Sequence, residues 1–407
     1  MRHLVGGISS AGRAVPALDG TPFIVARAAG PYLWDDRGRR YVDTALGFGA
    51  TILGHAPATV VAAVAVAMAD GASPAFAHDR EEQAAAALAA LTGPLSQVVF
   101  TSTGSEAVHL ACRIARAVTG RTLIAKAAAG FDGWYDDVAF GNAGAPEAAM
   151  TDNTRPRRGR TTLLRYNDFT DVEALFAETP DIAAVIVEPM MANAGCIVAD
   201  PGYLAHVAEV ARRHGALVIA DEVLMGFRIA PGLASHRLGF EPDLATVGKA
   251  IGSGVAVAAV VGRPEVMIAG EDGRASRGGT YAGNPVAAAA VIATLAELPL
   301  IDYPGLVARG DGLRAAIERS FAEAGTKVAT AGYGTVFTVW FADAAPRSYA
   351  EAHARLRPER SAALHAALRR HGVMTMPSPY GRLYLSSAHD AGVISELAGA
   401  FAAAAAG

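Results

Sequence analysis

Short runs of apolar residues, separated by amphipathic stretches, fill the middle of the chain and restrict its fold more than any other feature. The strand candidates cover residues 97–101, 122–125, 182–187, 216–220, 244–247 and 257–261. Helix candidates alternate with them at 105–119, 202–214 and 285–298. Continuous apolar strands are buried on both faces, which is typical of a parallel sheet covered by helices. The pattern therefore predicts an α/β fold with a mostly parallel sheet.

The length of 407 residues exceeds what one hydrophobic core usually serves, so we expect two domains. Residues 51–300 contain the strand–helix alternation and form the predicted large domain. Residues 301–407 are predicted to fold as a helix, strands and a further helix, which gives a smaller carboxy-terminal domain. The polar, aperiodic stretch 141–160 is a loop candidate, and loops of that length are usually functional or mobile.

Charge and cysteine content exclude several classes of protein. The net charge is −4, with 35 basic and 39 acidic residues, and no basic stripe indicates a nucleic-acid partner. The longest apolar run, 255–261, is too short to span a membrane. Cys112 and Cys196 have neither disulfide nor metal-ligand spacing, and the amino terminus lacks a signal-peptide core. We therefore expect a cytoplasmic protein without a metal site or a membrane anchor.

A carboxylate and a lysine stand at the ends of two predicted core strands. Asp221 closes the run 216–220, and Lys249 follows the run 244–247. Charged groups in such places are costly unless they are used. Pyridoxal 5'-phosphate (PLP) would use both, because its aldehyde forms a Schiff base with a lysine and its ring nitrogen needs an anion. Taken alone, the two residues are also compatible with a structural ion pair.

Two further segments suit a phosphate group. Gly104 and Ser105 open a predicted helix directly after a strand, where free N–H groups and the helix dipole favour an anion. The same residues also fit an ordinary helix cap. Thr280 lies in the glycine-rich segment 278–285 and offers a hydroxyl donor.

Four other residues are candidates for the ring and the substrate. Phe131 follows a strand and is able to stack on a pyridine ring, and Val223 is placed to close its other face. Asn193 is a candidate hydrogen-bond donor to the cofactor's phenolic oxygen. Arg13 lies in a glycine-rich leading segment, and arginine binds carboxylates in a bidentate manner. A core aromatic, a core valine, a loop asparagine and a surface arginine are the alternatives.

The joint order and spacing of these motifs resembles one known family from about Gly6 to His389. The chain is similar to class III, fold-type I PLP enzymes, and within them to glutamate-1-semialdehyde 2,1-aminomutase and its aminotransferase relatives. The motifs that carry the resemblance are 6–13, 32–35, 52–55, 102–107, 188–189, 221–228, 248–249, 279–285 and 385–389.

The resemblance implies a fold, an assembly and a role for each candidate. It implies a fold-type I architecture in which residues 1–50 join residues 301–407 in the small α+β domain. It implies a homodimer whose active sites are shared between subunits. The roles that it implies are the Schiff base for Lys249, the ring nitrogen for Asp221, the phosphate for Gly104 and Ser105, ring stacking for Phe131, cofactor contacts for Asn193 and Val223, the neighbouring subunit's phosphate for Thr280, and the substrate carboxylate for Arg13.

Two departures from the family pattern bear on the reaction. Phe131-Asp132 stands where the family usually has tyrosine and histidine, and Gly381 stands where the aminomutases place a glutamate. Arg382 is a candidate second cation for a substrate carboxylate, or else a solvent-facing arginine.

The expected activity is therefore aminotransfer through pyridoxamine phosphate. The amino donor bears a carboxylate, with β-amino acids as one candidate class, and the acceptor is a keto acid or an aldehyde. The alternative is an aminomutase-type isomerase that moves the amino group within one substrate. Decarboxylation and racemisation also remain open, because the same cofactor chemistry serves them.

Overall fold

A single large sheet forms the centre of the structure. The computed structural model describes residues 3–150 and 155–407, so residues 151–154 of the predicted loop lie outside it. The sheet has eight strands in the order β4-β13-β12-β11-β8-β5-β7-β6. Their bounds are Gln97–Thr101, Ala258–Gly262, Leu244–Val247, Leu217–Asp221, Ile182–Val187, Leu123–Ala127, Thr161–Leu164 and Arg157–Arg158, in that order. Strands β12, β11, β8, β5 and β7 run parallel, and β13 and β6 run antiparallel to their neighbours. The predicted mostly parallel α/β sheet is confirmed.

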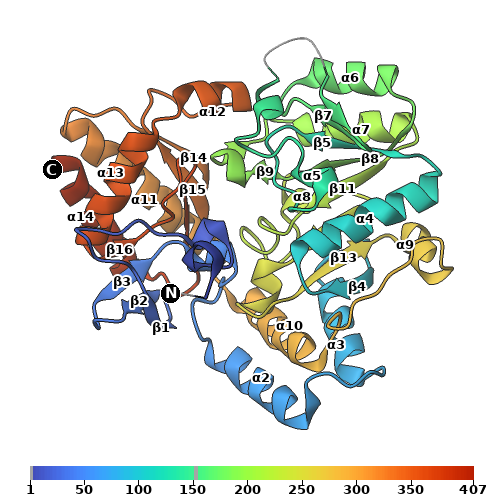
Figure 1. The fold of residues 1–407 in the computed structure, drawn as a ribbon, viewed down its shortest axis with the longest axis horizontal. Coiled ribbons are helices and arrows are strands. Elements are labelled where there is room, and N and C mark those ends of the chain that lie inside the picture. Colours follow the sequence, from blue (N-terminus) through green and yellow to red (C-terminus); the bar gives the residue numbers. More distant parts are fainter. Residues whose placement is uncertain (1–2, 151–154) are drawn as a thin grey trace.

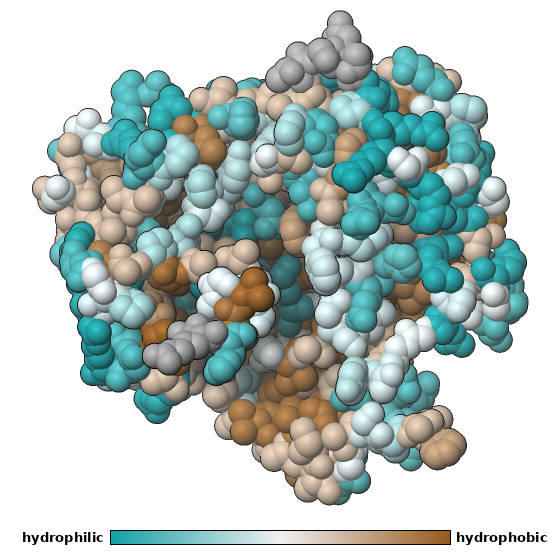
Figure 2. All heavy atoms as spheres, in the orientation of Figure 1, coloured by the Kyte–Doolittle hydropathy of each residue, from teal (hydrophilic) through white to brown (hydrophobic). Residues whose placement is uncertain are grey.

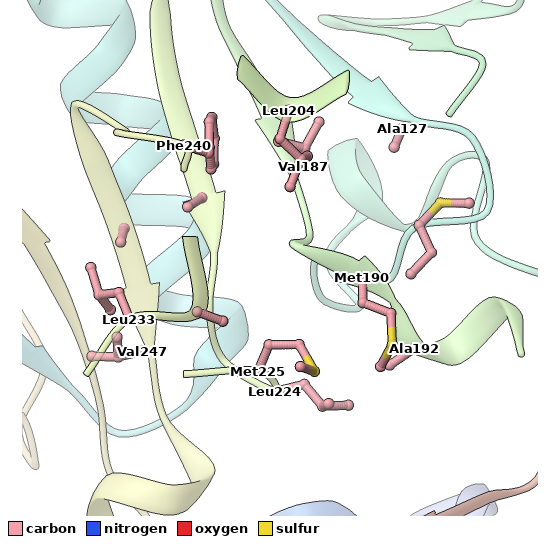
Figure 3. Packing of buried hydrophobic residues seen from close by; sticks show 14 of the residues in the cluster. Ala127, Val187, Met190, Ala192, Leu204, Leu224, Met225, Leu233, Phe240 and Val247 are labelled. Carbon is pink, nitrogen blue, oxygen red and sulfur yellow. The ribbon is translucent and has the colours of Figure 1, made fainter. Parts of the chain in front are cut away.

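Helices cover this sheet because its strands are apolar on both faces. All six residues of β8 are buried, and Leu204 of the helix Tyr203–Arg213 lies against Val187 at the end of this strand (Figure 3). The α-helices are α1 Leu46–Gly49, α2 Ala58–Gly71, α3 Asp79–Ala89, α4 Gly104–Thr119, α5 Asp136–Ala139, α6 Phe169–Glu178, α7 Tyr203–Arg213, α8 Ala234–Arg237, α9 Pro264–Glu271, α10 Pro285–Glu297, α11 Tyr303–Glu323, α12 Tyr349–Arg355, α13 Pro358–Arg370 and α14 Ala391–Ala406. Short 3₁₀ turns lie at Val5–Gly7, Ala11–Arg13, Pro146–Ala149, Ala192–Ala194, Lys249–Gly252 and Leu298–Leu300.

The two ends of the chain meet in smaller sheets beside the large one (Figure 1). Strand β3 pairs in parallel with β16, so an amino-terminal strand and a carboxy-terminal strand share one sheet. That sheet holds β1 Val25–Ala29, β2 Tyr32–Asp35, β3 Arg40–Asp43 and β16 Val373–Met374. The others hold β14 Ala329–Tyr333, β15 Val336–Trp340 and β17 Arg382–Tyr384, and β9 Met190–Met191 with β10 Ile197–Val198. The exact domain boundaries stay a prediction.

Parallel pairing decides where polar residues collect. The carboxyl ends of parallel strands lie at one edge of a sheet, and ligands of open α/β sheets bind outside that edge. Lys249 follows β12, Asp221 ends β11 and Glu188 follows β8, and these three strands are neighbours. The turn after β5, the next strand along, carries Asp132. Four strands therefore deliver charged side chains to one place.

Among the described residues, no single helix has both the length and the apolar character to cross a membrane. Only the pair Pro285–Leu300 and Tyr303–Glu323, which is bent by 78°, meets those criteria, and then only when both helices are counted together.

Two glycines in α11 give a matched test of packing. A Cβ built at buried Gly310 would lie 1.7 Å from the Gly334 carbonyl oxygen, whereas a Cβ at exposed Gly312 would meet nothing within 4 Å. We expect Gly310→Ala to lower the free energy of unfolding by about 1–3 kcal/mol, because overpacking moves the backbone. Gly312→Ala should raise it by about 0.5–1 kcal/mol, because alanine is the better helix former. Urea denaturation checks both, and equal effects of the two variants would contradict this packing.

Candidate active site

A pocket of about 190 Å³ opens at the carboxyl edge of the large sheet. Residues from four strand ends and from the start of α4 surround it. The lining residues are Thr103, Gly104, Ser105, Val108, Phe131, Asp132, Gly133, Glu188, Asn193, Asp221, Val223, Leu224 and Lys249. Beyond Lys249 and Asp221, six of the eight other predicted site residues are cofactor contacts. Five of these six line the same pocket: Gly104, Ser105, Phe131, Asn193 and Val223.

Lys249 occupies a strained position at the end of β12. Its φ is +43°, a region that L-residues other than glycine rarely adopt and that often marks a functional site. The amine makes no hydrogen bond within residues 3–150 and 155–407. Burial lowers the pKa of Lys249 to about 8, against the attraction of the Asp221 and Glu188 carboxylates. A larger fraction of the amine is therefore neutral near pH 8 than for an ordinary lysine.

The other two lysines of the chain form contacts outside the pocket. The ammonium of Lys126 donates to the carbonyl oxygens of Gly130 and Val138 and to the side chain of Asn142. Lys327 lies on the surface, where it pairs with Asp343 at 2.9 Å. Lys249 is therefore the one lysine of the sequence whose amine faces the pocket.

Asp221 is held in a fixed orientation beside the pocket. Its Oδ1 accepts hydrogen bonds from the Val223 N–H at 3.0 Å and from the Thr246 hydroxyl at 3.1 Å. No donor among the described residues is bound to Oδ2, which leaves that oxygen available to a ligand. Burial raises the pKa of Asp221 to about 7, and the negative charge of Asp132 adds to the shift. A cation in the pocket would reverse this shift and hold the carboxylate ionised.

Glu188 is a second buried acid at this edge. Its Oε1 accepts from the Phe131 N–H at 2.9 Å, and its Oε2 accepts from the Ala192 N–H at 3.4 Å. Burial raises the pKa of Glu188 to about 8, with further contributions from Asp132 and Asp221. These bonds tie the loops after β5 and β8 together and so fix two walls of the pocket.

The amino terminus of α4 presents free N–H groups to the pocket. The Thr103 hydroxyl caps the helix by accepting a hydrogen bond from the Glu106 N–H, and the Glu106 carboxylate accepts one from the Thr103 N–H. This capping box leaves the N–H groups of Gly104 and Ser105 without an intrahelical partner. A Cβ at Gly104 would lie 2.9 Å from Val223, so glycine is required for this close approach. The arrangement suits a phosphate.

Three predicted contacts do not line the pocket. Thr280 and Arg13 are both exposed, and neither contacts the pocket within one chain. Arg382 is buried rather than solvent-facing; its Nε donates to the Tyr384 hydroxyl at 2.9 Å. Its charge lies near enough to Lys249 to contribute to the lowered pKa of that lysine. The roles of these three residues stay predictions.

Sequence reasoning missed Lys126 and Thr246, and it treated Asp132 only as a departure from the family. Lys126 is completely buried in β5 and lies 3.2 Å from Asp132. A signal was present, because a lysine inside the run Leu123–Ala127 is unusual for a strand that is otherwise apolar. Thr246 gave no such signal, because threonine is common in strands.

The donor set fits PLP. A lysine amine and an available carboxylate oxygen border one buried pocket, as the aldehyde and the basic ring nitrogen require. Free N–H groups at α4 suit the phosphate, and Phe131 and Val223 offer apolar surfaces for the two faces of a ring. Each chemical feature of the cofactor therefore has a partner of the matching kind.

The lowered pKa of Lys249 predicts how fast the cofactor-free protein captures PLP. Only the neutral amine attacks an aldehyde, and its fraction rises with pH up to the pKa and is constant above it. We therefore expect the rate constant of covalent capture to rise about tenfold per pH unit below pH 8 and to level off above it. Stopped-flow absorbance on both sides of pH 8 measures this. A rate that still climbs steeply two units higher would indicate an ordinary lysine.

Comparison with known proteins gives consistent matches. The family model for Aminotransferase class-III matches residues 15–387. A glutamate-1-semialdehyde 2,1-aminomutase of Sorangium cellulosum is 38% identical over 400 residues, which cover 95% of this chain and 90% of that protein. The crystal structure of an omega-transaminase from Sphaerobacter thermophilus aligns with a TM-score of 0.88 at 30% identity, covering 99% of this chain and 94% of that one. A beta-phenylalanine aminotransferase from Variovorax paradoxus aligns with a TM-score of 0.87 at 29% identity, covering 98% and 90%.

Proposed function

Because the chain belongs to the class III aminotransferases, and is thus a fold-type I enzyme that uses PLP, we propose that it transfers an amino group from a carboxylate-bearing amine to a keto acid or an aldehyde. The observation that carries this proposal is the pairing of Lys249 and Asp221 across one buried pocket. β-Amino acids are one candidate class of donor, since a beta-phenylalanine aminotransferase shares the fold.

The residues that line the pocket would have different roles in such a reaction. PLP supplies an electron-accepting ring that stabilises negative charge at the carbon next to the nitrogen. We propose that Lys249 holds the aldehyde and, once released, moves the proton at the reacting carbon. Asp221 keeps the ring nitrogen protonated, and the α4 N–H groups anchor the phosphate. Phe131 and Val223 would offer apolar surfaces to the two faces of the ring, and Asn193 would bind its phenolic oxygen.

The turn at Gly381 favours intermolecular transfer over isomerisation. A Cβ at this position would lie 2.8 Å from the carbonyl oxygens of both Met376 and Ser378. The backbone therefore leaves no room for the glutamate that the family resemblance places here in aminomutases. The identity of 36–38% to two glutamate-1-semialdehyde 2,1-aminomutases supports the alternative, an isomerase.

Arg382 supports a substrate with a carboxylate. It is buried, and it forms no ion pair within the described residues. Its remaining contacts are long, at 3.5 Å to the Ala192 carbonyl and 3.8 Å to the Met376 sulfur. A buried guanidinium without a carboxylate partner is costly, and a substrate carboxylate would supply one. We propose that Arg382 and the more exposed Arg13 bind that group.

One experiment separates the two reactions. The PLP-loaded enzyme is incubated with glutamate-1-semialdehyde alone, and separately with α-, β- and ω-amino acids plus a keto acid. We expect product from amino acid and acceptor together, with carboxylate-bearing donors preferred over plain amines. Formation of 5-aminolevulinate from the semialdehyde without a second substrate would favour the aminomutase instead.

We further propose a cytoplasmic homodimer. Apolar side chains gather on the surface over α2, at the bottom of the view in Figure 2, where Val61, Val66 and Met68 are each more than half exposed. Covering them in a second copy would remove apolar surface from water. Cys112 and Cys196 are buried free thiols, which suits a reducing compartment. Sedimentation of the purified protein tests the assembly.

A further inference from the structure

The hydroxyl of Ser105, at the start of α4, is held by the backbone of the turn that follows β5. Its Oγ accepts a hydrogen bond from the Trp134 N–H at 3.3 Å. The part of the chain that the structure describes offers no acceptor for the hydroxyl proton. A serine hydroxyl has one O–H donor and accepts through its lone pairs, so the bond from Trp134 fixes the oxygen and leaves the donor free. Because Ser105 lines the pocket, a ligand there is able to accept from this donor.

The peptide group that joins Gly133 to Trp134 is held at both ends. Its N–H donates to Ser105, and its carbonyl oxygen accepts from the side-chain Nδ2 of Asn142 at 3.2 Å. Gly133 has a φ of +123°, and a Cβ at this position would lie 2.9 Å from Ser105 Oγ, so the close approach of the turn to the serine requires glycine. The position of the Ser105 hydroxyl therefore depends on Asn142, which lies at the start of the predicted loop 141–160.

Lys126 fixes the orientation of the Asn142 amide. Its completely buried ammonium donates to Asn142 Oδ1 and lies 3.2 Å from the Asp132 carboxylate, which balances its charge. An ammonium only donates hydrogen bonds, so the amide must turn its oxygen toward Lys126. The amide nitrogen then faces the Gly133 carbonyl, which only accepts. A continuous chain of hydrogen bonds thus runs from a buried charge to the Ser105 hydroxyl.

We propose that Asn142, oriented by Lys126, is a positioning residue that holds the Ser105 hydroxyl as a donor to the phosphate of PLP. A donor that is already held in place loses little conformational freedom when the phosphate binds, which strengthens binding. The inference rests on the proposed phosphate role of Ser105, but it does not depend on which amine the enzyme accepts.

The test compares PLP with pyridoxal, which has the same ring and aldehyde but no phosphate. Absorbance titration of the cofactor-free, full-length protein gives the dissociation constant of each. Asn142→Asp keeps one oxygen toward Lys126 but places the other against the Gly133 carbonyl, so the peptide is no longer held. We expect this variant to bind PLP about tenfold more weakly, as when one hydrogen bond to a charged group is impaired, and to bind pyridoxal as the wild type does. Equal losses for the two ligands would overturn the proposal.

A double-mutant cycle shows whether Asn142 acts through Ser105. Ser105→Ala removes the hydroxyl and should also weaken PLP relative to pyridoxal. In the Ser105→Ala background, Asn142→Asp should cause no further loss, because no hydroxyl remains to be positioned. Additive losses would overturn the inference and leave the phosphate role of Ser105 intact. An unchanged affinity for PLP in Ser105→Ala would overturn both, so the two failures are distinguishable.

Asn167→Asp is the matched control outside the pocket. Asn167 also donates its Nδ2 to carbonyl oxygens, those of Val198 and Arg347. The same substitution there should leave the affinities for PLP and pyridoxal unchanged, even where it lowers the melting temperature. A loss of PLP affinity as large as that of Asn142→Asp would overturn the proposal. Substitution of Lys126 is less specific, because it leaves the buried Asp132 carboxylate without its counter-charge.

Phosphorus NMR gives a readout in the PLP-loaded enzyme. The chemical shift of the bound phosphate reports its ionisation and its hydrogen bonds. The signal should move in Asn142→Asp and keep the wild-type position in Asn167→Asp. An unchanged signal in Asn142→Asp would contradict the positioning of Ser105. Neither measurement uses an amine substrate, so failure of the proposed aminotransferase activity would not alter their outcome.

Discussion

Lys249→Ala is expected to lower kcat by at least about 10⁴-fold, the largest effect of any single substitution in this protein. The change removes both the covalent attachment of PLP and the amine that moves the substrate proton, and proton transfer alone contributes up to about that factor. No other lysine replaces it, because Lys126 is fully hydrogen-bonded and Lys327 lies on the surface. Single-turnover kinetics with an amino donor measures the loss.

The covalent bond itself provides the decisive control. Borohydride reduction of the PLP-loaded wild type followed by peptide mapping should place the adduct on Lys249. Lys327→Ala serves as the matched lysine deletion and should behave as the wild type does, since its surface ion pair is worth little. A reducible adduct that survives in Lys249→Ala would show that the assignment of the reactive lysine is wrong.

Asp221→Asn is expected to lower kcat by about 10³-fold while PLP still binds. The amide no longer holds the ring nitrogen protonated, so the ring accepts negative charge poorly in the transition state; loss of one charge-stabilising group typically costs about 10²–10³-fold. The absorbance spectrum of the bound cofactor should change as well, because it reports the protonation of the ring. Pre-steady-state kinetics with one amino donor measures the chemical step.

The neighbouring acid supplies a control within the same turn. Glu222 is completely buried, and its carboxylate accepts from the N–H groups of Ala234 and Ser235 at the start of α8. Glu222→Gln should therefore lower the melting temperature and change the rate of the chemical step by less than about tenfold. Equal loss of that rate in both variants would mean that the effect of Asp221→Asn arises from folding.

Asp221 and Glu222 show how much of the site could be predicted from the sequence. Asp221 is the last residue of β11 and lines the pocket, whereas Glu222 follows the strand and does not line it. The residue pattern placed Asp221 at a strand end and suggested an anion for the ring nitrogen, and the family resemblance implied the same role. The structure adds the physical distinction, because Asp221 borders the pocket while Glu222 binds the backbone of α8.

Long-range contacts set the properties that no local pattern contains. Lys126 lies in β5, Asp132 lies in the turn after β5, and Asp221 ends β11, which β8 separates from β5 in the sheet. Because β5 and β11 are far apart along the chain, the sequence does not show that Asp132 and Asp221 line one pocket, nor that the pKa of both groups is raised. The sequence left two interpretations of Arg382, a substrate contact or a surface residue. The packing of β17 places its guanidinium in the interior.

The sequence by itself determined the strand–helix alternation, the mostly parallel sheet and the places of Lys249 and Asp221 at strand ends, since periodicity and strand-end chemistry are local properties of a chain. Only the tertiary structure decided which charges face one another. Burial and the approach of like charges shift proton affinities, and both depend on distances between segments that are remote in sequence. The raised pKa of Asp132 and of Asp221 is therefore a property of the fold rather than of any motif.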